Sequence, residues 1–177
     1  VRRYGIPHEY FHEMIAGVSS DLEPRRIETF DELYRYCYQV ASVVGLTIIH
    51  IFGFEDRRAL ELAEKCGIAF QLTNILRDVK EDAELGRVYL PAEDLRRFGV
   101  TGFTGGPEFR ELMRFEAARA REYYEASRPL VDLVHPESRA SLRALIAIYR
   151  RLLERIEASG YDVLSRRIRL PGWEKLY

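Results

Sequence analysis

The sequence has little of what marks a secreted, membrane-spanning or nucleic-acid-binding protein. Its two cysteines, Cys37 and Cys66, stand among apolar residues inside helical patterns, which favours buried, reduced thiols in a cytosolic protein. No run approaches the ~18 apolar residues of a membrane span, and the first residues lack a signal-peptide pattern. With 27 basic and 28 acidic residues, the net charge is -1. We therefore expect a cytoplasmic protein that binds no nucleic acid and contacts a membrane, at its inner face, only peripherally.

Strand-like alternation is also scarce, because no apolar–polar alternation runs longer than a few residues, and this predicts an all-α chain. Apolar residues recur instead at spacings of three and four. The expected helices cover about residues 6–18, 29–53, 56–84, 91–99, 108–134 and 136–159. Thr29 followed by Glu32 predicts a capping box that opens the second of them. No repeat or linker divides the sequence, so we expect one helical domain over residues 1–177.

One face of the helix expected over residues 56–84 changes from small to polar along its length. Spacings of four and three place on this face Ala63, Gly67, Gln71, Asn74, Asp78 and Asp82. Small residues let a ligand approach the backbone, and carboxylates at i and i+4 can hold Mg²⁺ through oxygen ligands, with an amide oxygen as a neutral third ligand. Arg77, Lys80 and Arg87 are close enough in sequence to bind phosphate oxygens. The face suits a ligand with an apolar tail and an anionic head.

The preceding helix carries a matching stripe, so the two faces together favour a cleft. Its members are Tyr36, near the polar end, and Val40, Ala41, Val44 and Gly45 along the wall. Each pattern has a simpler explanation. The small residues are typical of ordinary close helix packing, and Asp78 and Asp82 could form surface ion pairs with Arg77, Lys80 or Arg87.

Four segments make the chain similar to a known family over nearly its whole length. They are "TFDELYRYCYQVASVVGL", "FQLTNILRDVKEDAELGRVYLPAEDLRRFGV", "ELMRFEAARAREYY" and "IYRRLLERIEASGYDVLSRRI". The second is the most specific, because it resembles the NxxxDxxxD signature and following Arg-x-Tyr-x-Pro flap of the squalene and phytoene synthases. The resemblance implies an all-α, isoprenoid-synthase-type helical bundle around a central cavity.

The resemblance implies a prenyltransferase that condenses two allylic prenyl diphosphates head to head. Two segments, "GIPHEYFHEMIAGV" and "SGYDVLSRRIRLPGWEKLY", look most similar to bacterial presqualene diphosphate synthases of the hopanoid pathway, so two farnesyl diphosphates are the expected substrates. The alternative is a phytoene synthase that uses geranylgeranyl diphosphate in a carotenoid pathway. NADPH is needed only if the product is squalene, and the chain has no GxGxxG fingerprint.

The same resemblance assigns roles to individual residues. It implies that Asn74, Asp78 and Asp82 bind Mg²⁺, or Mn²⁺, bridging to the diphosphate, with Gln71 beside them and Tyr36 in the catalytic site. Arg77, Arg87 and Tyr89 would lie near the diphosphate or close the flap. The prenyl tunnel would be lined by Tyr36, Val40, Ala41, Val44, Gly45, Ala63 and Gly67, while Tyr149, Arg167 and Lys175 are further candidate phosphate contacts.

One departure from the family and two competing hypotheses remain. The family uses two Asp-rich motifs and this chain carries one, so we expect the C-terminal two-thirds of a longer enzyme, inactive as an isolated fragment. A non-catalytic member acting as a lipid-binding or assembly scaffold is the first alternative. The second is a zinc protease, because His8, Glu9 and His12 match HExxH, with Glu28 or Glu32 as a further ligand. The pattern predicts no oligomeric state.

Overall fold

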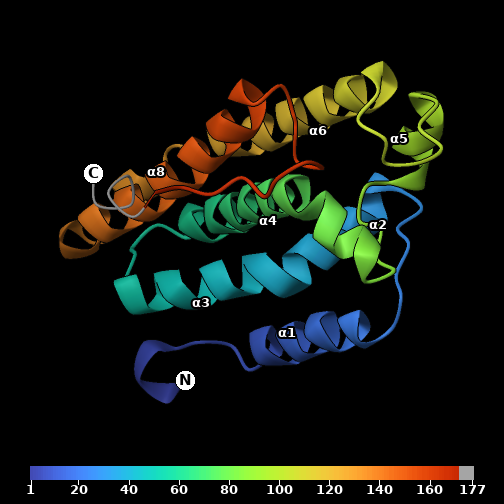
Figure 1. Cartoon of the computed structure of the whole chain (residues 1–177). Coiled ribbons are helices and arrows are strands. Elements are labelled where there is room, and N and C mark those ends of the chain that lie inside the picture. The colour runs from blue at the N-terminus through green and yellow to red at the C-terminus, as the bar shows by residue number, and fades with distance from the viewer. Residues whose placement is uncertain (172–177) are drawn as a thin grey trace.

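The fold is organised around α4 (Arg58–Glu84), a helix of 27 residues that is about 40 Å long at 1.5 Å per residue. In the computed structural model, which describes residues 1–171, other helices lie against α4 on several sides (Figure 1). Its buried side chains therefore point in several directions and include Ile68, Leu72, Ile75 and Leu76. No strand occurs within residues 1–171, where two isolated bridges are the only extended pairings. The predicted all-α class is confirmed.

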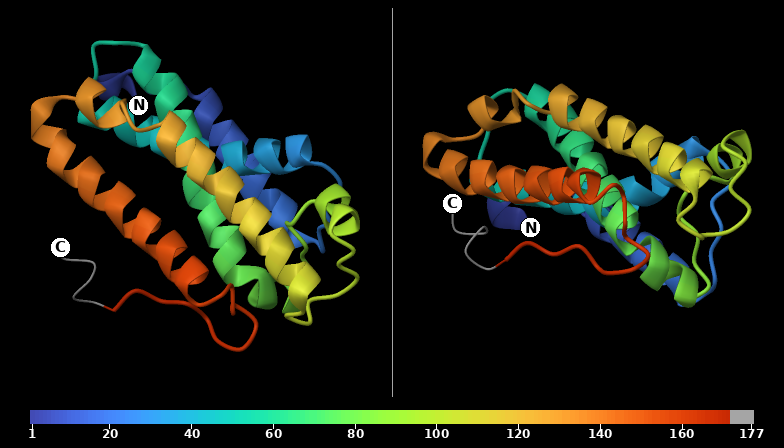
Figure 2. Two further views of the ribbon diagram at one scale, coloured as in Figure 1. Left: turned by 90° about the horizontal axis from the view of Figure 1, so that it is seen from above. Right: turned by 45° about the horizontal axis from the view of Figure 1, so that its top comes forward.

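Seven further helices accompany α4 in residues 1–171. They are α1 (Glu9–Ser19), α2 (Phe30–Cys37), α3 (Val43–Phe52), α5 (Ala92–Arg97), α6 (Pro107–Ala126), α7 (Leu130–Leu133) and α8 (Pro136–Ala158), with the short turns η1 (Arg2–Tyr4) and η2 (Ser20–Leu22). In Figure 1, α1 and α3 lie on one side of α4, and α6 and α8 lie on the other. The views in Figure 2 show α6 and α8 next to each other, and both contact α4.

Two of the expected helices differ from the observed ones. The helix predicted over residues 29–53 is interrupted by a π-helical segment, η3 (Tyr38–Ser42), between α2 and α3. The helix predicted over residues 108–134 ends at Ala126, and the short α7 follows after Pro129. Proline lacks an N–H and disfavours helical geometry in the residue before it, which explains the second break.

The π-helical segment η3 packs directly against α4. Ser42 is fully buried, and its Oγ donates a hydrogen bond of 2.8 Å to the carbonyl oxygen of Glu64. On α4, a Cβ added at Gly67 would lie 2.5 Å from the Cα of Ser42. Because only glycine permits this approach, Gly67 fixes the distance between η3 and α4.

The corner between α3 and α4 is attached to the start of α8. Gly53 has a positive φ of 80°, and a Cβ at this position would lie 2.4 Å from Nδ1 of His135. The backbone N–H of His135 donates to the carbonyl oxygen of Gly53 at 2.9 Å. Ser138 Oγ donates to the carbonyl oxygen of Phe52 at 3.0 Å. These contacts hold two helix ends together at one end of the bundle.

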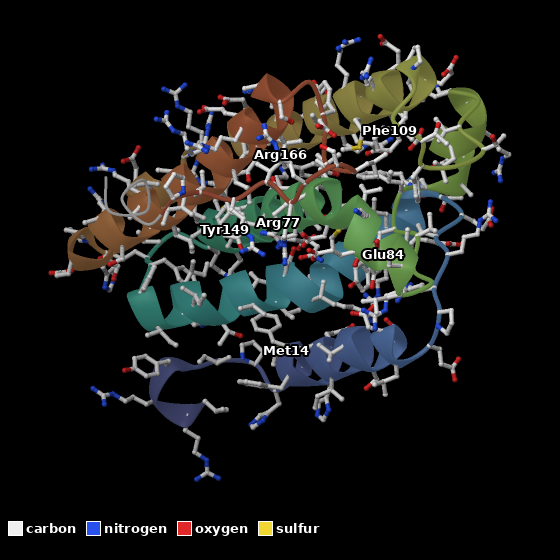
Figure 3. The ribbon with its side chains drawn as sticks, viewed as in Figure 1. Met14, Arg77, Glu84, Phe109, Tyr149 and Arg166 are labelled. Carbon is white, nitrogen blue, oxygen red and sulfur yellow. The ribbon has the colours of Figure 1, made fainter. Side chains whose placement is uncertain are left out.

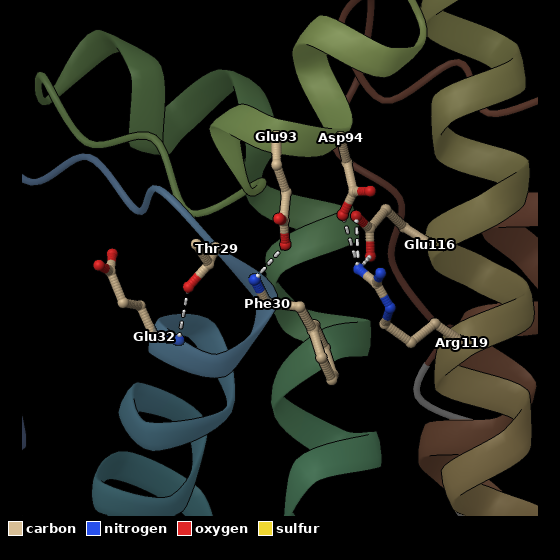
Figure 4. Close-up of polar contacts among 7 residues, drawn as sticks. All are labelled: Thr29, Phe30, Glu32, Glu93, Asp94, Glu116 and Arg119. Atoms are coloured by element: carbon tan, nitrogen blue, oxygen red, sulfur yellow. Dashed lines mark hydrogen bonds and ion pairs between the residues drawn. The ribbon is translucent and has the colours of Figure 1, made fainter.

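The start of α2 combines a helix cap with a contact to α5 (Figure 4). The predicted cap is present, since Thr29 Oγ1 accepts a hydrogen bond of 3.3 Å from the N–H of Glu32. The Glu32 carboxylate accepts from the N–H of Glu28 instead of completing a box with Thr29. The N–H of Phe30 donates to Glu93 of α5 at 2.7 Å.

A buried cluster of two acids and one arginine joins α5 to α6, as Figure 4 shows. Arg119 donates to Asp94 at 2.9 Å and to Glu116 at 2.8 Å, and its guanidinium lies 4.0 Å from the ring centre of Phe30. Glu116 is 2% exposed. Burial, above all, raises the pKa of its carboxyl to about 8, and the charge of Asp94 adds to this effect. Glu116 is therefore protonated at neutral pH.

Replacing Glu116 with glutamine should flatten the pH dependence of stability. The folded state binds the proton with a pKa of about 8, and the unfolded chain with the ordinary value near 4.3. The stability from this proton is complete below pH ~4.3 and is lost as the pH rises through about 8. Urea titrations from pH 5 to 8 should show the free energy of unfolding of the wild type falling by up to about 1.4 kcal/mol per pH unit relative to Glu116→Gln.

Glu122→Gln serves as the matched control, because Glu122 is an exposed carboxylate on the same helix. This variant should keep the pH slope of the wild type. Parallel curves for the wild type and Glu116→Gln would show that the buried carboxyl holds no extra proton.

Replacing Gly67 of α4 or Gly45 of α3 with alanine should change the free energy of unfolding by different amounts. Gly67→Ala forces a Cβ to within 2.5 Å of backbone atoms of Ser42, so it should lower the free energy of unfolding by about 1–3 kcal/mol. A Cβ at Gly45 meets only the carbonyl oxygen of Ala63 at 3.5 Å, and alanine favours a helix by up to ~1 kcal/mol. Urea unfolding of both variants tests this, and equal effects would contradict it.

Candidate active site

An apolar cavity of about 260 Å³ lies between α3, α4, α7 and α8. The two stripes of small residues meet across it, so they do form the walls of a cleft. Val40, Ala41, Val44 and Gly45 line one side, and Ala63, Gly67, Gln71 and Asn74 line the other. Close packing is also part of their role, because Gly67 touches Ser42 while it lines the cavity.

The remaining wall comes from α7 and α8, and of the residues there the sequence analysis named only Tyr149, as a candidate phosphate contact. Leu142, Leu145 and Tyr149 line the cavity from α8, and Leu130 does so from α7. The ring of Tyr149 stacks on Phe70 with centroids 4.2 Å apart and an angle of 13° between the planes. The spacing of three and four on α8 was the available signal, but it did not show which helix α8 would face.

The cavity becomes polar toward the C-terminal end of α4. Gln71 and Asn74 line it there, and the side-chain N–H of Asn74 donates to the amide oxygen of Gln71 at 3.3 Å. This bond leaves the amide oxygen of Asn74 available to a cation or donor. Asp78 and Asp82 follow on the same face, one and two turns further along.

Asp78 is held by two arginines. Arg77 donates through Nε at 2.8 Å and through a second nitrogen to the other carboxylate oxygen. Arg167 lies 3.0 Å from Asp78 and also 3.0 Å from Glu81. The side chain of Asp78 is 17% exposed, so these ion pairs compensate a largely desolvated charge. The predicted pairing of Asp78 with Arg77 is present, but it is largely buried and not a surface ion pair, and Arg167, from the far end of the chain, was not predicted as a partner.

Asp82 has a different environment. Within residues 1–171, no side chain forms a hydrogen bond or an ion pair with its carboxylate. Partial burial raises its pKa to about 6, with a further contribution from the charge of Asp78, and the nearby Arg87 partly offsets both. Asp82 is therefore mostly ionised at neutral pH, where a cation would stabilise it.

The donor set fits a hard divalent cation. Asn74, Asp78 and Asp82 offer only oxygen ligands along one helix face, which suits Mg²⁺. In the described part of the chain, three or more acidic, histidine or cysteine side chains do not converge on one point. A metal at Asp78 would also have to compete with Arg77 and Arg167 for the carboxylate.

Tyr36 and Tyr89 form a second cluster beside the carboxylates. Their rings stack with centroids 4.7 Å apart, and their hydroxyls donate to Asp21 at 2.9 Å and 2.7 Å. The side chain of Arg87 donates to the carbonyl oxygen of Asp21 at 2.6 Å. Burial raises the pKa of both phenols, that of Tyr89 to about 12, so both keep their protons at neutral pH. Tyr36, predicted to line the tunnel, is 3% exposed and is not part of the cavity wall.

This cluster depends on a pairing between distant segments. The N–H of Val88 donates to the carbonyl oxygen of Arg25 at 2.7 Å, and the N–H of Ile27 donates to that of Val88 at 3.2 Å. This backbone pairing places the ring of Tyr89 next to that of Tyr36. Asp21 was missed because it belongs to no motif and lies far in sequence from its partners, so no local signal identified it.

The other predicted contacts are divided between two pockets. Arg77, Tyr149 and Arg167 line a second pocket of about 290 Å³, which adjoins the cavity because Tyr149 lines both. Figure 3 shows Arg77 and Tyr149 close to one another at the centre of the bundle. Lys80 is exposed. Lys175 lies outside the described residues.

The structure gives no support to the zinc-protease hypothesis. His8, Glu9 and His12 are exposed at the start of α1, and no third ligand joins them in the described range. Glu32 accepts a hydrogen bond from the backbone of Glu28. No helix in residues 1–171 is long and apolar enough to cross a membrane.

Cys37 and Cys66 are buried free thiols, as expected.

Comparisons with known proteins identify the family of the chain. Residues 1–174 match the sequence model of the squalene/phytoene synthase family. A phytoene synthase from Arthrospira platensis is 39% identical over 98% of this chain and 62% of its own length. A 15-cis-phytoene synthase from Synechococcus elongatus is 40% identical with the same coverage.

Solved structures of similar proteins share the fold. A dehydrosqualene synthase in complex with a ligand has a TM-score of 0.89 and 32% identity, covering 97% of this chain and 62% of its own. A squalene synthase from Alicyclobacillus acidocaldarius has a TM-score of 0.85 and 28% identity, covering 91% and 63%. The chain thus spans about 62% of the length of the curated relatives it matches first. It belongs to the squalene/phytoene synthase family.

Proposed function

We propose that this site serves the head-to-head condensation of two allylic prenyl diphosphates in the complete gene product. One observation carries the proposal. An apolar cavity between two helices with small residues ends at Gln71 and Asn74, and Asp78 and Asp82 follow Asn74 on the same helix face, one and two turns further along. Such a site can hold a hydrocarbon tail while its polar end receives a diphosphate through cations. The phytoene and squalene synthases among its relatives support this reaction class.

In this proposal, the carboxylates bind the diphosphate through metal ions and the arginines bind it directly. Asn74, Asp78 and Asp82 would hold Mg²⁺ or Mn²⁺, which when bound neutralises the leaving diphosphate. Arg77 and Arg167 are already gathered at Asp78, and guanidinium groups bind phosphate oxygens in a forked geometry. An incoming diphosphate would therefore compete with Asp78 for these arginines and free its oxygens for the metal.

The apolar part of the cavity would protect a reactive cation. Apart from Cys66, Gln71, Asn74 and Tyr149, its wall consists of apolar residues, so water has few partners there. The stacked rings of Phe70 and Tyr149 border the cavity, and aromatic rings stabilise cations through their quadrupole. The second prenyl double bond would attack C1 of the cation, and loss of a proton would close a cyclopropane ring.

The length of the donor is the open point of this proposal. The sequence patterns favour two farnesyl diphosphates and presqualene diphosphate. The curated relatives named above are phytoene synthases with 39% and 40% identity, which favours geranylgeranyl donors. The structural relatives, at 32% and 28% identity, are dehydrosqualene and squalene synthases. Because the identities to the phytoene synthases are higher, we propose geranylgeranyl diphosphate as the preferred donor.

Binding of Mg²⁺ and inorganic diphosphate to this chain should be cooperative. Arg77 and Arg167 compete with metal for Asp78, so each ligand alone should bind weakly. Together they should bind about tenfold tighter or better, because the diphosphate takes the arginines and the carboxylates take the metal. Isothermal titration calorimetry with each ligand alone and with both measures this coupling.

The Asp78→Asn variant should lose the coupling and keep its helical circular dichroism. Glu84→Gln is the matched control, because Glu84 is an exposed carboxylate near the end of the same helix. It should bind like the wild type. Unchanged coupling in Asp78→Asn would return the carboxylate to a purely structural ion pair.

Product analysis of the complete gene product tests the reaction itself. With Mg²⁺ and no NADPH, mass spectrometry should detect prephytoene diphosphate or phytoene from geranylgeranyl diphosphate, and Asp78→Asn should reduce turnover by orders of magnitude. Presqualene diphosphate from farnesyl diphosphate would assign the shorter donor, with NADPH needed only for squalene. If the folded protein coupled neither donor, the scaffold hypothesis would replace this one.

A further inference from the structure

Asp21 is an acidic side chain near the proposed site that accepts hydrogen bonds from two phenols. It lies in η2 (Ser20–Leu22), directly after α1. Its carboxylate accepts hydrogen bonds from Tyr36 on α2 and from Tyr89 in the segment that follows α4. Its backbone oxygen accepts from Arg87 of the same segment. Three separate parts of the chain therefore meet at one residue.

We propose that Asp21 is a positioning residue, which holds residues 87–89 against the polar end of the site and orients both phenols. This inference rests on the proposed function, since it concerns the binding of the diphosphate. Asp21 itself is not expected to touch the substrate. It acts through Tyr89, Tyr36 and Arg87.

The carboxylate determines the direction of both hydrogen bonds with the phenols. An ionised carboxylate accepts hydrogen bonds and donates none. Both hydroxyl hydrogens must therefore point to Asp21, and the remaining lone pairs of each phenol oxygen stay available to donors or cations. An asparagine has nearly the same shape, but its NH₂ group would donate to one of the phenols and reverse that bond.

The position of Arg87 connects this arrangement to the carboxylates of α4. The backbone N–H of Arg87 donates to the carbonyl oxygen of Asp82 at 2.8 Å, while its side chain reaches Asp21. Arg87 is thus fixed at both its backbone and its side chain. Its charge stays beside Asp82, where a diphosphate would arrive, only as long as residues 87–89 remain attached to η2.

Packing around the two rings leaves few other ways to hold them. Tyr36 is 3% exposed and Tyr89 6% exposed. Besides the stacking between them, the guanidinium of Arg25 lies 4.8 Å from the ring centre of Tyr36. Apolar packing holds the rings in place, and the shared acceptor orients both hydroxyls.

The test uses the chain with 3-fluorotyrosine incorporated and its ¹⁹F spectrum, which needs no ligand. The signals of Tyr36 and Tyr89 are assigned from the variants Tyr36→Phe and Tyr89→Phe. Asp21→Asn should shift both signals. Glu23→Gln is the matched control, since Glu23 is an exposed carboxylate two residues away, and it should shift neither.

The same variants are then titrated with Mg²⁺ and inorganic diphosphate. Asp21→Asn should weaken binding by about tenfold or more, as expected for the loss of hydrogen bonds to a charged group. Tyr89→Phe should weaken it too, and the double variant should be little worse than Asp21→Asn, because both changes break the same contact. Tyr89→Phe keeps its ring, so it supplies the test if Asp21→Asn does not fold.

Each result decides between distinct conclusions. Unshifted ¹⁹F signals in Asp21→Asn would overturn the proposal at once. Shifted signals with unchanged affinity would reduce Asp21 to a structural contact and also overturn it. Strictly additive losses in the double variant would show that Asp21 does not act through Tyr89. A wild type that binds no diphosphate with Mg²⁺ would instead contradict the binding predicted for this chain, the proposed reaction would still be decided by product analysis of the complete gene product, and the ¹⁹F result would still report how the rings are held.

Discussion

The contact between α4 and the π-helical segment η3 is the constraint on which the rest of the site depends. Because Gly67 has no Cβ, the backbone of Ser42 can lie against it. Ser42 then reaches the carbonyl oxygen of Glu64 and is satisfied without water. This approach sets the register of α3 against α4 and so turns both stripes of small residues toward one cavity. A wider spacing would leave the same residues on separate surfaces.

The sequence was informative where the signal is local. The helices, the cap at Thr29 and the small-to-polar face from Ala63 to Asp82 follow from the spacing of residues within single elements. The break before α7 and the π-helical turn at Tyr38–Ser42 were missed, because the apolar period continues across both. Tyr36 shows the consequence: its spacing from Val40 placed it on the wall, but the π turn intervenes and Tyr36 packs on Tyr89 instead.

Contacts between distant segments account for the rest of what could not be predicted. Arg167 reaches Asp78, and Tyr89 reaches Asp21, across long stretches of chain. Charge and residue type alone permit many such pairs. The two carboxylates on this helix face therefore have different environments, since Asp78 forms ion pairs with two arginines and Asp82 forms none within residues 1–171. The surface ion-pair hypothesis therefore does not describe both residues, and the metal hypothesis stays a prediction for both.

The attachment of the α3–α4 corner to α8 has a consequence for the shape of the cavity. Gly53 is pressed against His135, and Ser138 is bonded to Phe52, so the helices cannot slide past each other at the apolar end. These contacts lie about one turn of α3 beyond Ile48 and Ile49, which line the cavity, so they hold α3 and α8 together next to its apolar end. Side chains such as Ile49 and Leu130, which line the cavity, then set the room that it leaves for an apolar chain. In such a cavity, the volumes of a few lining side chains decide which length of apolar chain fits.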